Sequence, residues 1–265
     1  MSEALTPQIH PTAIVSRGAE LAAGVVIGPY TVIGERVRIG ENSVVGPSCL
    51  LEGPTTIGRD NRIYGHAAIG TDPQDLKFQG EETFLEIGDA NRIREFVTIN
   101  RGTGAATSYT RIGSRNLLMT GVHVAHDCRV GDDAILANAA TLAGHVLVGD
   151  RATVGAFSGI HQFCRVGMHA FIGGYSVITQ DALPFMKTVG ARGEARSYGP
   201  NTIGLERLGF SSERQRALKE AFRTLFHRGL KLKEAIEQIR ASDALTPDVE
   251  ELVRFVESSE RGVIR

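Results

Sequence analysis

Aliphatic residues recur at every sixth position over most of the chain. The first series runs through Ile9, Val15, Leu21, Ile27, Ile33, Ile39, Val45, Leu51, Ile57, Ile63 and Ile69; the period resumes at Ile87, Ile93 and Ile99, and again from Ile112 to Ile178. The fourth residue after each aliphatic one is usually small, as at Ala13, Ala67 and Ala134. A hexapeptide period is typical of a parallel β-helix, in which three short strands and three turns make one coil of 18 residues. We therefore predict an all-β solenoid with an aliphatic core.

Two interruptions of the period fall at about residues 71–85 and 105–110. A solenoid accommodates insertions as outward loops, which often lie on its binding face. After Pro184 the period stops, and the spacing of Leu218, Phe222 and Leu225 indicates a helix that begins near Ser212 and ends at Gly229. Further helices are expected over 232–241 and from Pro247. We predict a β-helix over 1–190 with these two loops, and a C-terminal helical domain over 191–265 that covers the open last coil.

Composition and charge narrow the functional classes. The net charge is −1, which does not suggest nucleic-acid binding. No apolar run approaches the roughly 20 residues of a membrane span, and the first residues lack the features of a signal peptide, so a cytoplasmic protein is expected. The cysteines Cys49, Cys128 and Cys164 occupy small positions of the repeat and form no CxxC pair, so we interpret them as core residues.

Polar residues gather between positions 123 and 162. They are His123, His126, Asp127, His145, His161 and Gln162, and none of them occupies a core position of the repeat. Since residues 18 apart lie at the same place on successive coils, His126, Gly144 and Gln162 should form one column about 10 Å long. The remaining histidines, His10, His66, His169 and His227, stand alone, and we interpret them as structural or surface residues.

A histidine cluster suits two chemistries. Three imidazoles can bind zinc, as in a carbonic-anhydrase-like hydratase, or one can act as a general base. Asp127 beside His126 is placed to orient that imidazole, and Gly144 one coil above offers a backbone N–H to an oxyanion. We favour base catalysis with neither metal nor cofactor; the zinc-dependent trimer and a purely structural solenoid are the alternatives.

Several motifs carry a resemblance to a known family. They are Ile9-His10-Pro11-Thr12-Ala13-Ile14, Gln74-Asp75-Leu76-Lys77, Ile99-Asn100-Arg101-Gly102-Thr103, His126-Asp127-Cys128, Leu142-Ala143-Gly144-His145, His161-Gln162-Phe163-Cys164 and Arg261-Gly262-Val263-Ile264-Arg265. With them the chain resembles the acyl-carrier-protein-dependent UDP-N-acetylglucosamine O-acyltransferases, which begin lipid A synthesis in Gram-negative bacteria. The resemblance implies a left-handed β-helix and a homotrimer with sites between subunits.

The resemblance also implies residue roles. His126 would remove the proton from the glucosamine 3-hydroxyl of UDP-N-acetylglucosamine, which attacks the thioester of a 3-hydroxyacyl carrier protein. Asp127 would orient His126, and the Gly144 N–H would stabilise the oxyanion. Substrate contacts are expected from Asp75, Lys77, His123, His145, His161, Gln162, Asn201 and Arg207, and Gly174 occupies the position that limits acyl length.

Three residues depart from the family's common pattern. Asn100 stands where a histidine often precedes Arg-Gly-Thr, and Ile203 and Leu208 replace polar residues near Arg207. These differences leave two acceptors open, one with a 3-hydroxyl and one with a 3-amino group. The sequence does not define the length of the acyl chain.

Overall fold

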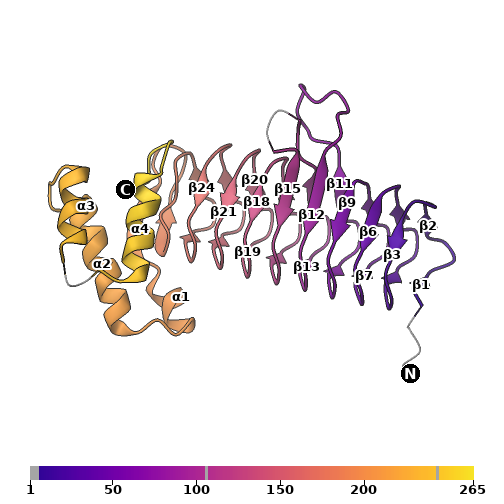
Figure 1. Cartoon of the computed structure of the whole chain (residues 1–265), viewed down its shortest axis with the longest axis horizontal. Helices are drawn as coiled ribbons and strands as arrows, with labels where there is room; N and C mark the ends of the chain where they lie inside the picture. The colour runs from indigo at the N-terminus through magenta and orange to yellow at the C-terminus, as the bar shows by residue number, and fades with distance from the viewer. Residues whose placement is uncertain (1–5, 105–106, 243–244) are drawn as a thin grey trace.

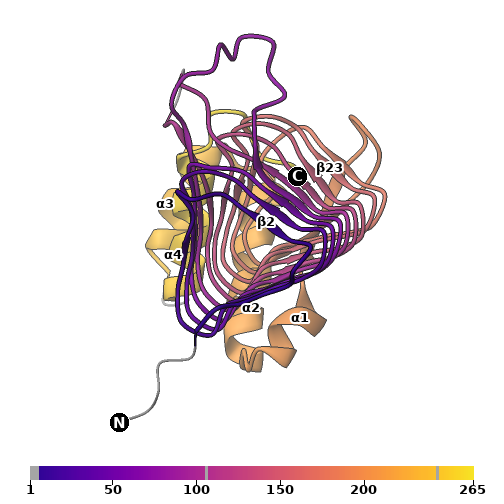
Figure 2. The same cartoon turned by 90° about the vertical axis from the view of Figure 1, so that its right-hand side faces the viewer.

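The computed structural model describes residues 6–104, 107–242 and 245–265. Most of the chain winds into a triangular prism whose three faces are parallel sheets, with the helices gathered at its C-terminal end (Figures 1 and 2). No helix in these ranges is long and apolar enough to cross a membrane.

The strands are short, and each coil contributes one to every face. Sheet A contains β1 (Gln8–Ile9), β4 (Val26–Ile27), β7 (Val44–Val45), β10 (Arg62–Ile63), β13 (Arg92–Ile93), β16 (Leu117–Leu118), β19 (Ile135–Leu136), β22 (Thr153–Val154), β25 (Phe171–Ile172), β27 (Met186–Val189) and β28 (Arg196–Pro200). Sheet B contains β2 (Ile14–Val15), β5 (Val32–Ile33), β8 (Leu50–Leu51), β11 (Ala68–Thr71), β14 (Thr98–Asn100), β17 (His123–Val124), β20 (Thr141–Leu142), β23 (Gly159–Ile160) and β26 (Val177–Ile178). Sheet C contains β3 (Glu20–Leu21), β6 (Val37–Ile39), β9 (Thr55–Ile57), β12 (Phe84–Ile87), β15 (Tyr109–Ile112), β18 (Arg129–Val130), β21 (Leu147–Val148) and β24 (Arg165–Val166).

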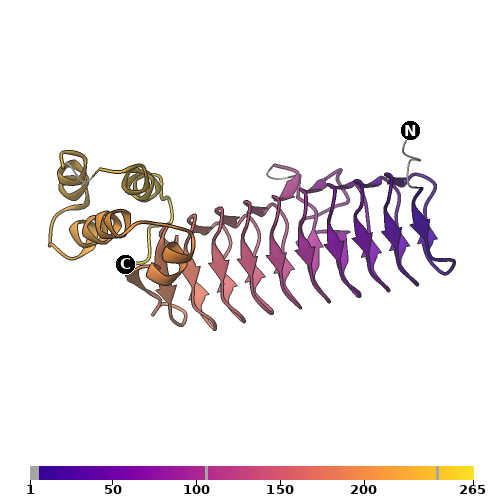
Figure 3. The same cartoon turned by 90° about the horizontal axis from the view of Figure 1, so that it is seen from below.

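The register follows the sequence period. Val124 pairs with Leu142, 18 residues further on, and Leu142 pairs with Ile160. The strands stack as successive rungs when the prism is seen from below (Figure 3). The predicted fold class, a left-handed parallel β-helix with a small C-terminal helical segment, is confirmed.

Two insertions leave the regular coil. The first occupies residues 72–83 between β11 and β12 and projects outward from the prism at the top of Figure 1. The second begins directly after β14, at residue 101, and returns to the prism at Tyr109 in β15. Ala105 and Ala106, the first residues of the expected second break, lie outside the described residues. Both insertions lie between sheets B and C, so they share one edge of the prism.

The corners repeat one backbone conformation. Residues such as Asp127, His145 and Phe163 adopt positive φ angles of 60°, 63° and 63°. This left-handed conformation is uncommon for residues with a side chain, and here it turns the chain from one sheet to the next at every coil. Some of these corner side chains are exposed, such as Phe163, whereas others are buried, such as Asp127.

The core consists of the aliphatic positions of the repeat. Ile33, Leu51, Ile99 and Leu136 have no exposed surface, and Cys128 and Cys164 fill small positions beside them, as predicted. Burial raises the pKa of the Cys128 thiol to about 12 and that of Cys164 to about 11. Since the thiolate is the reactive form, both thiols are inert packing groups.

The C-terminal part closes the last coil. β27 pairs with β28 as an antiparallel hairpin, so sheet A extends past residue 190. The helices α1 (Thr202–Arg207), α2 (Ser212–Phe226), α3 (Leu232–Arg240) and α4 (Pro247–Glu257) pack around a second apolar cluster. The helix α2 begins at Ser212, as predicted, and the hydroxyl of the preceding Ser211 caps it by accepting from the Arg214 N–H.

Candidate active site

Two adjacent columns of side chains occupy the corner between sheets B and C. Asp127, His145 and Phe163 stand at its left-handed positions on successive coils, each preceded by a member of the column His126, Gly144 and Gln162. The His126 and His145 rings meet edge to face at 5.1 Å, and His145 stacks on Phe163 at 4.3 Å. The repeat therefore gathers side chains from three coils at one place.

His126 and Asp127 are in direct polar contact at this corner. The His126 Nδ1 lies 2.9 Å from the Asp127 Oδ2, and the Asp127 side chain is 1% exposed whereas that of His126 is 14% exposed. Burial alone would raise the pKa of Asp127, but hydrogen bonds from His126 and Thr103 outweigh it, so the pKa is lowered and the carboxyl group is ionised. A buried carboxylate on Nδ1 fixes the imidazole with its Nε2 turned outward.

Gly144 lies directly against the His126 ring. A Cβ placed on Gly144 would stand 2.6 Å from the His126 Cε1 and 2.8 Å from its Nε2, well inside contact distance. Among the described residues, no acceptor forms a hydrogen bond with the Gly144 N–H. The absence of a side chain here leaves room for the imidazole, and an unpaired amide stands beside it.

The two neighbouring histidines stay neutral. Burial lowers the pKa of His123, and the nearby His126 lowers it further; the His123 Nδ1 lies 2.7 Å from the Thr98 hydroxyl. Burial also lowers the pKa of His145, although Asp127 and Asp75 act in the opposite direction. Both rings can therefore donate or accept one hydrogen bond toward a ligand at neutral pH.

The first inserted loop lies near the same corner. Its Asp75 is half-buried and close enough to His145 to affect the pKa of that ring, and its Oδ1 accepts a hydrogen bond from the Lys77 N–H. Lys77 and Leu76 are exposed, and Leu76 is entirely uncovered at 106% of its reference surface. The loop thus places the Asp75 carboxylate near His145, and Leu76 and Lys77 follow it on the exposed surface.

Of the other expected site residues, two lie at this corner and three do not. His161 and Gln162 lie one coil above Gly144, where the His161 Nδ1 stands 3.5 Å from the Arg261 guanidinium. Gly174 precedes Tyr175 at the corner between sheets A and B. Asn201 caps α1 and lies beside His169, at the third corner, and the exposed Arg207 ends that helix.

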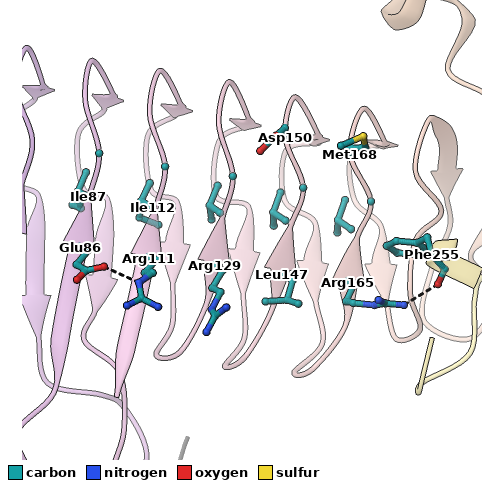
Figure 4. A pocket seen from close by; sticks show the side chains of 18 of the residues that line it. Glu86, Ile87, Arg111, Ile112, Arg129, Leu147, Asp150, Arg165, Met168 and Phe255 are labelled. Atoms are coloured by element: carbon teal, nitrogen blue, oxygen red, sulfur yellow. Dashed lines mark hydrogen bonds and ion pairs between the residues drawn. The ribbon is translucent and has the colours of Figure 1, made fainter. Parts of the chain in front are cut away.

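Two hollows adjoin the site. One of about 610 Å³ reaches from Asp127 and His145 past Phe163 to Arg261. The other, of about 780 Å³, runs along sheet C, where Glu86, Arg111, Arg129, Leu147 and Arg165 stand on successive coils (Figure 4). The row ends where Arg165 donates to the Phe255 carbonyl of α4. Arg129, Leu147 and Arg165 line both hollows, so the site continues onto an open face of the prism.

The corner also brings together three side chains whose donor atoms are of the kind that bind a metal ion. One donor atom each from His126, Asp127 and His145 lie within 4.8 Å of one another. Zinc is held by such nitrogen and oxygen donors, usually three in a catalytic site. The geometry by itself is compatible with both chemistries considered for the sequence.

Several residues of this corner have no role predicted from the sequence. Phe163 could have been found from the period, since it lies 18 residues after His145. Thr98, Thr103 and Arg261 reach the site from a neighbouring coil, an inserted segment and the C-terminus, and no spacing in the sequence indicates these contacts.

A left-handed β-helix with a histidine–aspartate pair beside a glycine amide defines the class of hexapeptide-repeat acyltransferases. Residues 181–264 match the family model "Udp N-acetylglucosamine O-acyltransferase; Domain 2". The acyl-[acyl-carrier-protein]–UDP-N-acetylglucosamine O-acyltransferase of Syntrophobacter fumaroxidans is 49% identical over 97% of this chain and 100% of its own length. The enzyme of the same name from Thermodesulfovibrio yellowstonii is 46% identical over 97% of this chain and 99% of its own length. The solved UDP-N-acetylglucosamine O-acyltransferase of Moraxella catarrhalis superposes with a TM-score of 0.93 at 42% identity, covering 97% and 99% of the two chains. The chain belongs to the acyl-[acyl-carrier-protein]–UDP-N-acetylglucosamine O-acyltransferase family, and it is an acyltransferase.

Proposed function

We propose that this acyltransferase moves a 3-hydroxyacyl chain from acyl carrier protein to the 3-hydroxyl of UDP-N-acetylglucosamine, as the first step of lipid A biosynthesis in the cytoplasm. Its relatives are named for an acyl-carrier-protein donor and this sugar nucleotide. The single observation that supports His126 as the general base is its position: Nδ1 is held by the buried Asp127, and Nε2 faces Gly144.

The proposed chemistry uses three groups of the corner. The His126 Nε2 accepts the proton of the sugar 3-hydroxyl while that oxygen bonds to the thioester carbonyl carbon. The carbonyl oxygen becomes an oxyanion near the Gly144 N–H, and the ionised Asp127 stabilises the imidazolium. When the tetrahedral intermediate collapses, the carbon–sulfur bond breaks, and the imidazolium returns its proton to the departing thiolate of the carrier protein.

Contacts to the substrates are assigned by position. His123 and His145 are neutral hydrogen-bonding groups beside the base, and Asp75 and Lys77 approach from the loop. We place the acceptor sugar among these four residues, with His161 and Gln162 one coil further along. A solvent-exposed Gly174 leaves space for the end of a long acyl chain.

We propose that the active enzyme is a homotrimer. Gly174, Asn201 and Arg207 lie at the other two corners of the same prism, so one chain cannot bring them to His126. A neighbouring subunit packed against the site corner could supply them. The uncovered Leu76 and the open hollow along sheet C are surfaces that such a neighbour would bury.

An acyl-transfer assay tests the proposal. Purified protein is mixed with UDP-N-acetylglucosamine and 3-hydroxyacyl carrier proteins of several lengths, and His126→Ala is compared with the control His66→Ala, a ring stacked on Phe96 at another corner. We expect His126→Ala to lose at least about 10³-fold in kcat and the control to keep its activity. Full activity of His126→Ala would remove it as the base.

Two further experiments distinguish this proposal from a 3-amino acceptor and from zinc-dependent catalysis. A sugar nucleotide with a 3-amino group replaces the acceptor in one arm, and preferred turnover of that compound would reassign the acceptor. In the other arm the enzyme is treated with a chelator and analysed for metals, and stoichiometric zinc whose removal abolishes activity would overturn base catalysis. Light scattering measures the mass in solution, for which a trimer is expected.

A further inference from the structure

A short segment beside the site holds the catalytic carboxylate. Thr103 is 3% exposed, its hydroxyl donates to the Asp127 Oδ2 at 2.7 Å, and its N–H lies 3.2 Å from both carboxylate oxygens. The same Oδ2 faces the His126 Nδ1. Thr103 therefore acts on His126 only through Asp127, and it fixes the plane of the carboxylate on which the imidazole depends.

The preceding residues of this segment hold the start of the inserted loop. The Asn100 Nδ2 donates to the Thr71 hydroxyl and to the Asp72 carbonyl, both at 2.9 Å. The Arg101 guanidinium donates to the Gly70 carbonyl and pairs with the Asp72 carboxylate, although its own side chain is only 10% exposed. A buried guanidinium needs such partners, since charge is costly to desolvate.

The end of the segment holds the far side of the loop. The Gly104 N–H donates to the Glu81 Oε1 at 3.0 Å, and the Glu81 Oε2 accepts from the Gln79 N–H at 2.9 Å. Residues 100–104, here called the bracing segment, thus contact both ends of the loop and Asp127. The loop carries Asp75 and Lys77, while Asp127 orients the base.

The bracing segment has little freedom to shift. A Cβ on Gly102 would lie 2.3 Å from the Tyr109 N, so the chain passes directly against the next strand. Asn100 is 1% exposed, and its Nδ2 lies within hydrogen-bond distance of both Thr71 and Asp72. The amide satisfies the loop backbone from inside the protein, which assigns this residue to the loop and not to the substrate.

We propose that the bracing segment is a positioning element of the reaction: Thr103 sets the orientation of His126 through Asp127, and Asn100 and Arg101 hold the sugar-binding loop in register with it. This rests on the proposed function of His126 and of the loop. The two halves predict different kinetic effects. Loss of the Thr103 hydroxyl affects the chemical step, whereas loss of the Arg101 to Asp72 pair affects binding of the sugar nucleotide.

The first test compares Thr103→Val, which keeps shape without the hydroxyl, with Thr103→Ser, which restores it. We expect Thr103→Val to lower kcat about tenfold to 100-fold with KM for the acceptor nearly unchanged, and Thr103→Ser to recover most of the loss. Because the pKa of Asp127 rises without this donor, the acid limb of the kcat profile should move to higher pH. An unchanged kcat and pH profile in Thr103→Val would overturn the proposal.

Two controls test whether the Thr103 variant folds and whether His126 is the general base. Thermal unfolding identifies a Thr103→Val protein that has not folded, in which case Thr103→Ala is measured against the same criteria. His126→Ala is assayed in parallel: if it is inactive while Thr103→Val behaves as wild type, the bracing role is wrong and the proposed base stands. If His126→Ala is fully active, the proposed function itself fails.

The second test is Asp72→Asn, which removes the charge partner of Arg101 at the base of the loop. We expect KM for the sugar nucleotide to rise about fivefold or more while kcat stays within about twofold, since a loop that is less ordered must be fixed on binding. Asp60→Asn is the matched control, because Asp60 pairs with Arg59 on the exposed surface of another corner. A KM for Asp72→Asn equal to the control would refute the loop half of the proposal.

Discussion

Replacing Gly144 with alanine isolates the position of the base from every other property of the site. The new methyl group would lie 2.6 Å from the His126 Cε1 and 2.8 Å from its Nε2. The backbone accepts a Cβ at this place, because His126 and Gln162 occupy the equivalent positions one coil below and above and Gly144 has no positive φ angle. The clash is therefore with the imidazole alone.

The size of the effect follows from the distances. Carbon atoms in contact stand about 3.5–4.0 Å apart, so the ring has to move by about 1 Å. Its Nδ1 is bound to Asp127 at 2.9 Å, so the ring can yield only by tilting and moving Nε2 away from the reacting oxygen. A misplacement of about 1 Å costs about 100-fold in rate, which corresponds to about 2.7 kcal/mol of activation free energy.

The assay measures kcat and KM for the acceptor together with the thermal midpoint of unfolding. We expect kcat to fall about 100-fold while the thermal midpoint changes little, since the backbone gain of about 0.4–1 kcal/mol from exchanging glycine for alanine at an ordinary φ is offset by the cost of displacing the ring. Gly159→Ala is the control, because a Cβ there has no neighbour within 4 Å. A wild-type kcat in Gly144→Ala would refute the assigned position of the base.

Three further predictions concern the pH response, the closing segment and the acyl chain. His169 is buried between Phe185 and Phe210, and burial lowers its pKa. As the pH falls, the unfolded chain therefore binds a proton at this residue before the folded chain does. The free energy of unfolding should decrease as the pH drops below about 6.5. His169→Phe should reduce this decline, as measured by urea unfolding at pH 7.5 and 5.5, and an equal decline in both proteins would contradict the assignment. Asp181→Asn should lower the free energy of unfolding by about 3 kcal/mol, because the buried carboxylate of Asp181 pairs with Arg165 at 2.8 Å. Chemical unfolding measures this change, and a loss below about 0.5 kcal/mol would show that the pair is dispensable. Gly174→Met should shift the preferred acyl donor to a shorter chain in a competition assay between carrier proteins, and an unchanged preference would remove Gly174 from the acyl path.

The sequence by itself determined the coil. An aliphatic residue at every sixth position can be buried throughout only if the chain turns after each short strand, so the period defines the core, the corners and the 18-residue register. That register also placed His126, Gly144 and Gln162 in one column, because within an uninterrupted solenoid distance along the chain converts directly into distance in space. The same local rule correctly put the cysteines inside.

Where the period is interrupted, it no longer predicts which residues lie close together in space. It could not show that Thr103 reaches Asp127, that Asn100 and Arg101 hold the inserted loop, or that β27 and β28 form a hairpin, because these contacts join segments whose spacing is set by insertions and by the chain end. Nor could it show that Asn201 and Arg207, which follow the end of the repeat, lie at a corner remote from His126. The sequence repeat determined where each coil lies. The tertiary structure decided which side chains from the irregular segments complete the site, because their positions depend on packing and hydrogen bonds that no sequence period encodes.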